Sequence, residues 1–174
     1  QLELLKGRGC GAMSTAHNMP AQVHMDLCDS IGMMVMARSF DMWIYPKCKN
    51  GYARFFKEWA DRDITNLVLA NRHHPSIVMW SVGNEIPEQS SEKGPAMLRH
   101  LQDLIHKYDT TRPITNGMDR GMTPVKTGFA HVSEVIGMNY RTHIYNNVYK
   151  ATGQGFLLGS ETASTVSSRG VYKF

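Results

Sequence analysis

The sequence predicts an α/β fold built on a parallel sheet, and three features of its 174 residues lead to that fold class. Apolar segments of strand length alternate with amphipathic segments of helical length from one end of the chain to the other. The strand segments are continuously apolar, as expected for parallel strands covered on both faces. No internal repeat or low-complexity linker divides the chain. The pattern alone leaves open whether the sheet is doubly wound or a (β/α)8 barrel.

The first part of the chain predicts two helices around one strand. Residues 1–9 form a short helical segment, and residues 11–18 predict a strand that leads into a loop. Pro20 opens the next helix in its first turn, where the missing N–H group costs nothing, and Gly32 ends it. The apolar face of this helix is expected to comprise Val23, Leu27, Cys28 and Ile31.

The central part contains the clearest helices. Residues 33–37 ("MMVMA") predict an apolar strand, and residues 40–51 predict a loop. The next helix is predicted over residues 52–69, because apolar side chains recur there at intervals of three and four residues, with one wider interval before Ile64. These side chains are Tyr52, Phe55, Phe56, Trp59, Ile64, Leu67 and Val68. Residues 76–82 predict another strand. A second amphipathic helix is predicted over residues 94–109, with an apolar face of Met97, Leu98, Leu101, Leu104, Ile105 and Tyr108.

Three further strands are predicted in the last part of the chain. They lie at residues 112–117, 134–139 and 155–160, and a short helix over residues 143–152 separates the last two. Six strands that alternate with helices are typical of a parallel α/β sheet.

Composition excludes several classes of function. The net charge of +4 comes from 19 basic and 15 acidic residues, and the basic ones are scattered, so no nucleic-acid partner is expected. No apolar run approaches the roughly 18 residues of a membrane span, so no membrane partner is expected either. The three cysteines, Cys10, Cys28 and Cys48, lack a C-x-x-C spacing and are expected to be small buried residues rather than zinc ligands or a disulfide framework.

One glycine-rich stretch calls for a separate test. Residues 7–12 ("GRGCGA") fit the loose G-x-G-x-x-A pattern of a dinucleotide site. They follow a predicted helix and precede a predicted strand, the reverse of the order that phosphate binding at a helix N-terminus requires. No cofactor and no metal site is therefore predicted. The sequence shows no targeting signal, but it also begins without Met, so the compartment stays open.

Polar side chains follow four of the predicted strands at the point where each strand ends. His17 and Asn18 come at the end of the first strand, Asn84 and Glu85 at the end of the third, Asn139 and Tyr140 at the end of the fifth, and Glu161 at the end of the sixth. In a (β/α)8 barrel the carboxyl ends of the strands converge on one face, which holds the active site. A barrel would therefore bring these side chains together, and the apolar run at residues 77–82 would be its wall.

Two facing carboxylates are the equipment for glycoside hydrolysis, in which one protonates the leaving oxygen and the other attacks the anomeric carbon or activates water. The pattern also permits plainer interpretations. Glu85 can be a carboxylate near a helix N-terminus, since Pro87 indicates a turn there, and Glu161 can cap a loop.

The segment "NRHHPSIVMWSVGNE", which ends in Asn84 and Glu85, resembles the acid/base motif of glycoside hydrolase family 2, the β-galactosidase, β-mannosidase and β-glucuronidase group. Upstream, "STAHNMP", "LCDSIGMMVM" and "SFDMW" resemble strands two and three of that family's barrel. Downstream, "DTTRPITNG", "VIGMNY" and "LLGSETASTVSSRG" resemble strands five to seven. The resemblance runs through essentially the whole chain in order. It implies an incomplete (β/α)8 TIM barrel, about strands two to seven.

The resemblance also implies roles for the residues at the strand ends. Glu85 is implied as the general acid/base and Glu161 as the nucleophile of a retaining double displacement. Asn84 is implied as the partner of the sugar 2-hydroxyl, Tyr140 as the residue that holds and polarises Glu161, and His17 as a ligand of a sugar hydroxyl. His17 can instead be a core histidine, and Tyr140 can instead have a structural role.

Several neighbouring residues are assigned on position alone. Trp80 lies within a strand and is expected to fill the wall. Asp41 and Trp43 follow the second strand and are candidates for lining the pocket. His73 and His74 precede a strand, so they are expected at the opposite end of the barrel, in a structural role.

The sequence departs from the family at three positions. Family members usually carry Arg where this chain has Ser14, and Asp-Glu where it has Ala37 and Arg38. A buried unpaired charge costs several kcal/mol, so Arg38 must find a partner or point outward. These changes leave the pocket's electrostatics open, while both glutamates are retained.

The expected function follows from the resemblance. Residues 1–174 are interpreted as a single partial catalytic domain of a longer protein, since strands one and eight and the preceding β-sandwich domains have no counterpart. The expected protein is an exo-acting β-glycosidase, with β-galactosidase as the best single guess, a carbohydrate as its partner, and a homo-oligomer as its possible assembly. The alternative is a degenerate or truncated barrel that binds carbohydrate without cleaving it.

Overall fold

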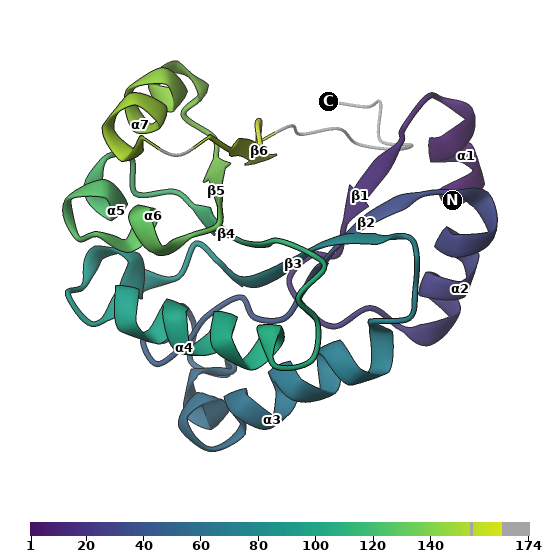
Figure 1. Cartoon of the computed structure of the whole chain (residues 1–174), viewed down its shortest axis with the longest axis horizontal. Coiled ribbons are helices and arrows are strands. Elements are labelled where there is room, and N and C mark those ends of the chain that lie inside the picture. The colour runs from purple at the N-terminus through teal and green to yellow at the C-terminus, as the bar shows by residue number, and fades with distance from the viewer. Residues whose placement is uncertain (154, 165–174) are drawn as a thin grey trace, which may run out of the picture.

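The computed structural model describes residues 1–153 and 155–164, and these residues form one parallel sheet with helices packed against it. The sheet order is β1-β2-β3-β4-β5-β6, so every strand pairs with its neighbours along the chain. Figure 1 shows the sheet as a curled layer with β1 and β6 at its two edges. The strands are Ala12–Ser14, Met34–Arg38, Ile77–Asn84, Ile114–Met118, Val135–Asn139 and Leu157–Glu161.

This topology decides between the two predicted folds. A doubly wound sheet reverses its strand order at a switch point, whereas strands in sequential order belong to a barrel. The six predicted strands are therefore confirmed as an incomplete (β/α)8 barrel. Residues 165–170, the end of the segment that resembles strand seven, lie outside the described residues.

The helices cover the outer side of the curled sheet (Figure 1). The long ones, α3 and α4, pack against each other and against the middle strands. The α-helices of the described residues are α1 (Leu2–Gly7), α2 (Gln22–Ile31), α3 (Ala53–Asn71), α4 (Gly94–His106), α5 (Thr123–Lys126), α6 (Phe129–Val132) and α7 (Tyr145–Thr152). Two 3-10 turns, η1 (Pro87–Ser90) and η2 (Thr142–Ile144), follow β3 and β5.

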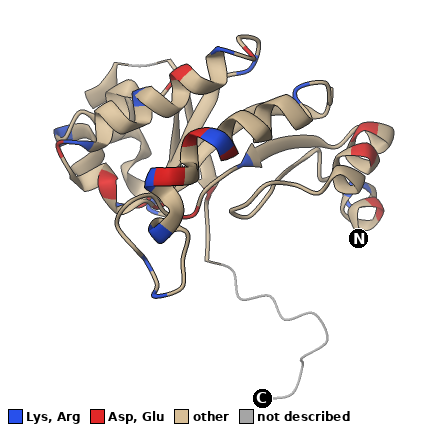
Figure 2. Ribbon diagram, turned by 90° about the horizontal axis from the view of Figure 1, so that it is seen from below, with Lys and Arg blue, Asp and Glu red and all other residues tan. Residues whose placement is uncertain are grey.

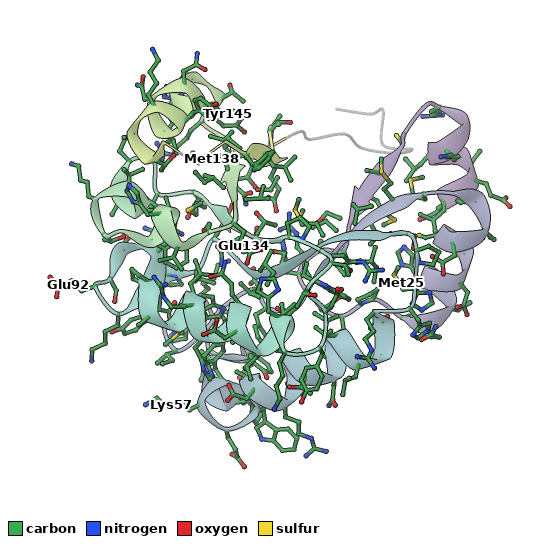
Figure 3. The ribbon with its side chains drawn as sticks, viewed as in Figure 1. Met25, Lys57, Glu92, Glu134, Met138 and Tyr145 are labelled. Carbon is green, nitrogen blue, oxygen red and sulfur yellow. The ribbon has the colours of Figure 1, made fainter. Side chains whose placement is uncertain are left out.

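Helix α2 differs in detail from its prediction. It begins at Gln22, so Pro20 lies before the helix rather than in its first turn, while Gly32 ends it in the left-handed region. Val23 is 75% exposed, and Met25 is buried instead, between α2 and the sheet (Figure 3). Successive helical residues are about 100° apart, so Val23 and Met25 point to opposite sides. Leu27, predicted on the buried face, is also exposed.

Helix α3 matches its predicted extent, but two of its aromatic side chains face solvent. Phe55 and Trp59 lie outside the buried stripe, at 44% and 37% exposure. The guanidinium groups of Arg54 and Arg62 stack over their rings and shield part of this apolar surface. The buried stripe is Phe56, Ala60, Ile64, Leu67 and Val68.

The expectation for the cysteines is wrong for two of the three. Cys28 lies on the buried face of α2, but Cys10 and Cys48 are exposed. Both of these lie outside the helices and strands, where no core is available to cover them.

The amino ends of the strands carry a polar network with a structural role. His74 Nδ1 lies 2.6 Å from Asp29 Oδ2, and its Nε2 lies 2.7 Å from Gln22 Nε2. The backbone N–H of Ser76 donates to Asp29 Oδ1 at 3.0 Å. These contacts join α2 to the segment that leads into β3, at the end of the barrel opposite the strand ends described next.

The charged side chains are mixed over the helices and loops. Figure 2 shows acidic and basic positions interspersed, with no basic stripe along the described elements. Lys57 and Glu92 project outward from the helical layer (Figure 3). Within the described residues, no helix combines the length and apolar character needed to cross a membrane.

Candidate active site

The carboxyl ends of five strands meet in one hydrogen-bonded cluster. Strand register sets the meeting point, because Arg38 lies opposite Ser81, Asn84 opposite Gly117, and Asn139 opposite Glu161. The cluster contains six of the residues expected at the strand ends, His17, Asn84, Glu85, Asn139, Tyr140 and Glu161, and adds Ser14, Arg38 and Ser160.

Glu161 accepts hydrogen bonds on both of its carboxylate oxygens. Arg38 Nη1 donates to Oε1 at 3.1 Å, and Tyr140 Oη donates to Oε2 at 2.7 Å. The hydrogen bond to Glu161, with a smaller effect of burial, raises the pKa of Tyr140 to about 12. The phenol therefore stays protonated near neutral pH and keeps its role as a donor to the carboxylate.

Glu85 has a different environment. Its Oε1 accepts a hydrogen bond of 2.9 Å from Asn139 Nδ2, a neutral donor. Its backbone has a φ of 50°, and Tyr140 and Arg141 also have positive φ values, of 57° and 48°. Non-glycine residues in this region cost on the order of 1 kcal/mol or more and cluster at functional sites. The surrounding structure thus holds the residues at two strand ends in a strained backbone conformation.

Arg38 is the centre of the cluster. Its side chain is 2% exposed, so the predicted alternative of pointing outward does not occur. Nη1 lies 2.6 Å from Asn84 Oδ1 and 3.2 Å from His17 Nδ1, in addition to its contact with Glu161. Nε donates to Ser14 Oγ at 2.6 Å. Burial lowers the pKa of Arg38, and the charge of Glu161 opposes this shift; an arginine nevertheless remains protonated in proteins.

Asn139 is the residue that connects the two sides of the cluster. It is fully buried, and its Nδ2 donates to Asn84 Oδ1 as well as to Glu85. Ser160 Oγ donates to its Oδ1 at 2.7 Å. The sequence placed Asn139 at the end of the fifth strand but gave neither Asn139 nor Ser160 a role in the site. The role of Asn139 depends on contacts with Asn84 and Glu85, which follow from the arrangement of the strands and not from the run "VIGMN".

Gly117 makes room for these amides, and Gly137 allows two neighbouring strands to approach each other. A Cβ atom on Gly117 would lie 2.7 Å from Asn84 Oδ1 and 3.0 Å from Asn139 Oδ1. A Cβ atom on Gly137 would lie 2.4 Å from the backbone oxygen of Asn116. The distances of 2.7 and 2.4 Å are shorter than a Cβ contact allows, so β4 presents bare backbone to the two amides at Gly117, and β5 packs closely against the backbone of β4 at Gly137.

The remaining predicted residues lie outside the cluster. Trp43 does not line the pocket: it is fully buried between Phe56 and Phe129, and its indole donates to Val82 O at 2.8 Å. Trp80 fills the wall, as expected. Asp41 pairs with Lys47, whose Nζ also donates to the backbone oxygen of Asn84 at 3.2 Å.

A polar cavity of about 280 Å³ opens beside Arg38, lined by Ser14, Ala16, His17, Ser160 and Glu161. The lining supplies a carboxylate, a guanidinium, an imidazole and two hydroxyl groups, all of which can form hydrogen bonds with a hydroxyl-rich molecule. Among the residues that the structure describes, no group of three His, Cys, Asp or Glu side chains is placed to hold a metal ion.

Comparison with known families gives the cluster its context. The model of "Glycosyl hydrolases family 2, TIM barrel domain" matches residues 1–160. The chain belongs to glycoside hydrolase family 2. This confirms the resemblance drawn from the sequence, and it places the cluster in a family 2 barrel.

Individual relatives agree with this assignment. The β-galactosidase BoGH2A of Bacteroides ovatus is 31% identical across 99% of this chain and 24% of its own length. The β-glucuronidase of Canis lupus familiaris is 30% identical across 64% of this chain and 17% of its own. A crystal structure of a family 2 member from Bacteroides cellulosilyticus superimposes with a TM-score of 0.84 at 33% identity, covering 90% of this chain and 20% of that one. The family 2 chain described here spans about a quarter of the length of BoGH2A.

Proposed function

We propose that this family 2 chain carries the catalytic pair of a retaining exo-β-glycosidase, with Glu161 as the nucleophile and Glu85 as the general acid/base. The observation that carries the proposal is the different environment of two carboxylates in one cluster. Glu161 is bonded to a guanidinium and a phenol, whereas Glu85 is bonded to a neutral amide. Two carboxylates in unlike environments are suited to unlike roles.

The proposed reaction is a double displacement that uses these contacts. Glu161 attacks the anomeric carbon while Glu85 protonates the leaving oxygen, and a glycosyl ester of Glu161 forms. Glu85 then removes a proton from water, and the water attacks the anomeric carbon and releases Glu161. Tyr140 and Arg38 hold the carboxylate of Glu161 on both oxygens, so its orientation is set before the substrate arrives.

Two further residues are proposed as substrate ligands. Asn84 binds the sugar 2-hydroxyl, a contact that strengthens in the transition state. His17 binds another hydroxyl of the same sugar. Arg38 can only donate, so His17 Nδ1 is the acceptor in their contact of 3.2 Å, and Nε2–H is the group left for the substrate.

The proposed substrate is a terminal β-galactoside, which rests on the similarity to BoGH2A along almost the whole chain. We also propose that residues 1–174 are one part of the catalytic barrel of a longer polypeptide, called the full-length protein below. In that protein the carboxyl groups of Glu85 and Glu161 are expected to lie roughly 5–5.5 Å apart, the retaining geometry.

The test is hydrolysis of 4-nitrophenyl β-galactoside by the full-length protein, with 4-nitrophenyl β-glucuronide as the matched comparison. Proton NMR of the first sugar released gives the stereochemistry, and the β anomer is expected. Initial release of the α anomer would contradict the retaining mechanism. Sugar binding measured by calorimetry without release of nitrophenol would favour the alternative, a degenerate barrel that binds carbohydrate without cleaving it.

A further inference from the structure

Arg38 differs from every other polar group in the cluster, because it donates hydrogen bonds and cannot accept them. Nη1 carries two protons and faces three acceptors, Asn84 Oδ1, His17 Nδ1 and Glu161 Oε1. The contact with Asn84, at 2.6 Å, is the shortest of the three. Nη2 approaches the backbone oxygen of Ser160 at 3.4 Å. A buried group with this bonding fixes the direction of each hydrogen bond that it makes.

The first consequence concerns the side-chain amide of Asn84. An amide has an acceptor end and a donor end of nearly the same size and shape, so neighbours decide which end points where. Asn84 Oδ1 faces Arg38 at 2.6 Å and Asn139 Nδ2 at 2.9 Å. A flipped amide would place two N–H donors against a guanidinium. Arg38 therefore keeps Oδ1 inside the cluster and directs Nδ2 to its other side.

The orientation of the Asn84 amide also fixes the orientation of the Asn139 amide, which contacts Glu85. Because Asn84 presents an oxygen, Asn139 must present its Nδ2, which also donates to Glu85 Oε1 at 2.9 Å. Asn139 Oδ1 then faces Ser160 Oγ at 2.7 Å. The amide relay, defined as Asn84 and Asn139, thus runs from the guanidinium to the proposed acid/base.

We propose that Arg38 is a positioning residue that sets the direction of the amide relay and thereby selects the two atoms that face the substrate. These atoms are Nδ2 of Asn84, which donates to the sugar 2-hydroxyl, and Oε2 of Glu85, which carries the transferable proton because Oε1 is occupied by Asn139. The inference rests on the proposed function, since it assigns atoms within the same site.

The direction of the relay matters because a hydroxyl has one proton. A 2-hydroxyl beside the carboxylate of Glu161 donates its proton there, so it needs a donor from Asn84. With the amide flipped, the carboxylate and Asn84 Oδ1 would compete for that proton, and one contact would be lost. Loss of Arg38 should therefore reduce the advantage that the 2-hydroxyl gives to catalysis.

The experiment compares 4-nitrophenyl β-galactoside with its 2-deoxy analogue in the full-length protein, using the ratio of the two kcat/KM values. The wild type is expected to prefer the 2-hydroxy substrate by about 100-fold or more, since 2-hydroxyl contacts strengthen in the transition state. Arg38→Met should lower this ratio at least tenfold. Asn84→Ala should lower it as well, and the double variant should lose no more than Asn84→Ala alone, because both changes remove the same contact. Arg62→Met, on the outer surface of α3, is the matched control and should keep the wild-type ratio.

An equal loss of activity on both substrates in Arg38→Met, with the ratio unchanged, would overturn the inference, since a structural defect moves both rates together. Arg38→Lys covers the case in which the Met variant does not fold. Lysine keeps a buried cation at this position, but it has one nitrogen where the guanidinium contacts the acceptors with three nitrogens. An intermediate ratio of the two kcat/KM values is therefore expected. A wild-type ratio in folded Arg38→Lys would then overturn the inference. Absence of hydrolysis by the wild type would instead overturn the proposed function, and with it the inference.

Discussion

At the scale of single residues, Glu161 and Glu85 have the same side chain but different hydrogen-bond partners. Glu161 is held at both oxygens, by the cation of Arg38 and by Tyr140, so it cannot rotate without losing a hydrogen bond. Glu85 is held at one oxygen, by Asn139, and its other oxygen is left for a proton. This asymmetry supports the proposed roles, with attack by the first carboxylate and proton transfer by the second.

The asymmetry predicts different kinetics for the two alanine variants of the full-length protein. Glu161→Ala should abolish the covalent intermediate, because no other carboxylate of residues 1–153 and 155–164 is hydrogen-bonded to both Arg38 and Tyr140. Glu85→Ala should slow glycosylation from an alkyl β-galactoside by about 10²–10⁴-fold, the usual contribution of a general acid. An activated dinitrophenyl glycoside should be slowed far less in that step, because its leaving group needs little protonation.

Pre-steady-state kinetics would measure the glycosylation step, and mass spectrometry would detect the ester on Glu161. Glu58→Ala, on the exposed face of α3, serves as the control for loss of a carboxylate. If Glu85→Ala slowed the activated and the alkyl glycoside by the same factor, Glu85 would not be the general acid.

At the scale of elements, the site depends on a strand position without a side chain as well as on the polar side chains at the strand ends. Gly117 in β4 lies between Asn84 in β3 and Asn139 in β5, and the two amides come within 2.9 Å of each other in front of it. Any side chain at this position would have to displace one of them. The relay therefore depends on a strand that adds no side chain to it.

Gly117→Ala adds a single methyl group, but it should displace one of the two amides and so disturb the site. The new Cβ would lie 2.7 Å from Asn84 Oδ1, and overpacking of this kind costs typically 1–3 kcal/mol. We expect a lower unfolding temperature and a reduced preference for the 2-hydroxy substrate, because the displaced atom is the one that Arg38 holds. Gly7→Ala in α1 is the control, since a Cβ there meets no atom within 4 Å. Wild-type stability and selectivity in Gly117→Ala would show that the amides can move without loss.

The sequence predicted the elements well because each strand is an apolar run that ends in a polar residue, and this pattern is local. It also predicted six strand-end residues of the cluster, from convergence of strand ends in a barrel. It did not predict the partners of Arg38. That side chain reaches His17, Asn84 and Glu161 across three other strands, and such contacts depend on sheet curvature and register rather than on spacing. The same limit applies to Val23 and Phe55, whose exposure depends on how each helix is rotated against the sheet.

At the scale of the whole molecule, the described sheet is a barrel that does not close. Strand β1 pairs with β2 alone and β6 with β5 alone, so both strands have an edge without a partner strand among the described residues. An apolar hollow of about 560 Å³ lies beside β6, lined in part by Met79, Val135, Phe156 and Leu158. Phe156 is 70% exposed. Open edges next to exposed apolar surface favour association between chains.

Residues 1–174 on their own should therefore be inactive and prone to associate, although both glutamates are present. Closure of a barrel fixes the tilt and stagger of its strands, and an open sheet is free to flatten or twist. Glu85 follows β3 and Glu161 ends β6, so any change in curvature alters the distance between their carboxyl groups. Catalysis needs such groups held within about 0.5 Å of their working positions. Light scattering on the purified chain should show large or polydisperse assemblies, and an assay beside the full-length protein should show a loss of activity of at least about 10²-fold, as expected for catalytic groups misplaced by about 1 Å. A monomeric chain that unfolds cooperatively and hydrolyses the galactoside at a rate near that of the full-length protein would contradict this, and would mean that six strands suffice to hold the pair.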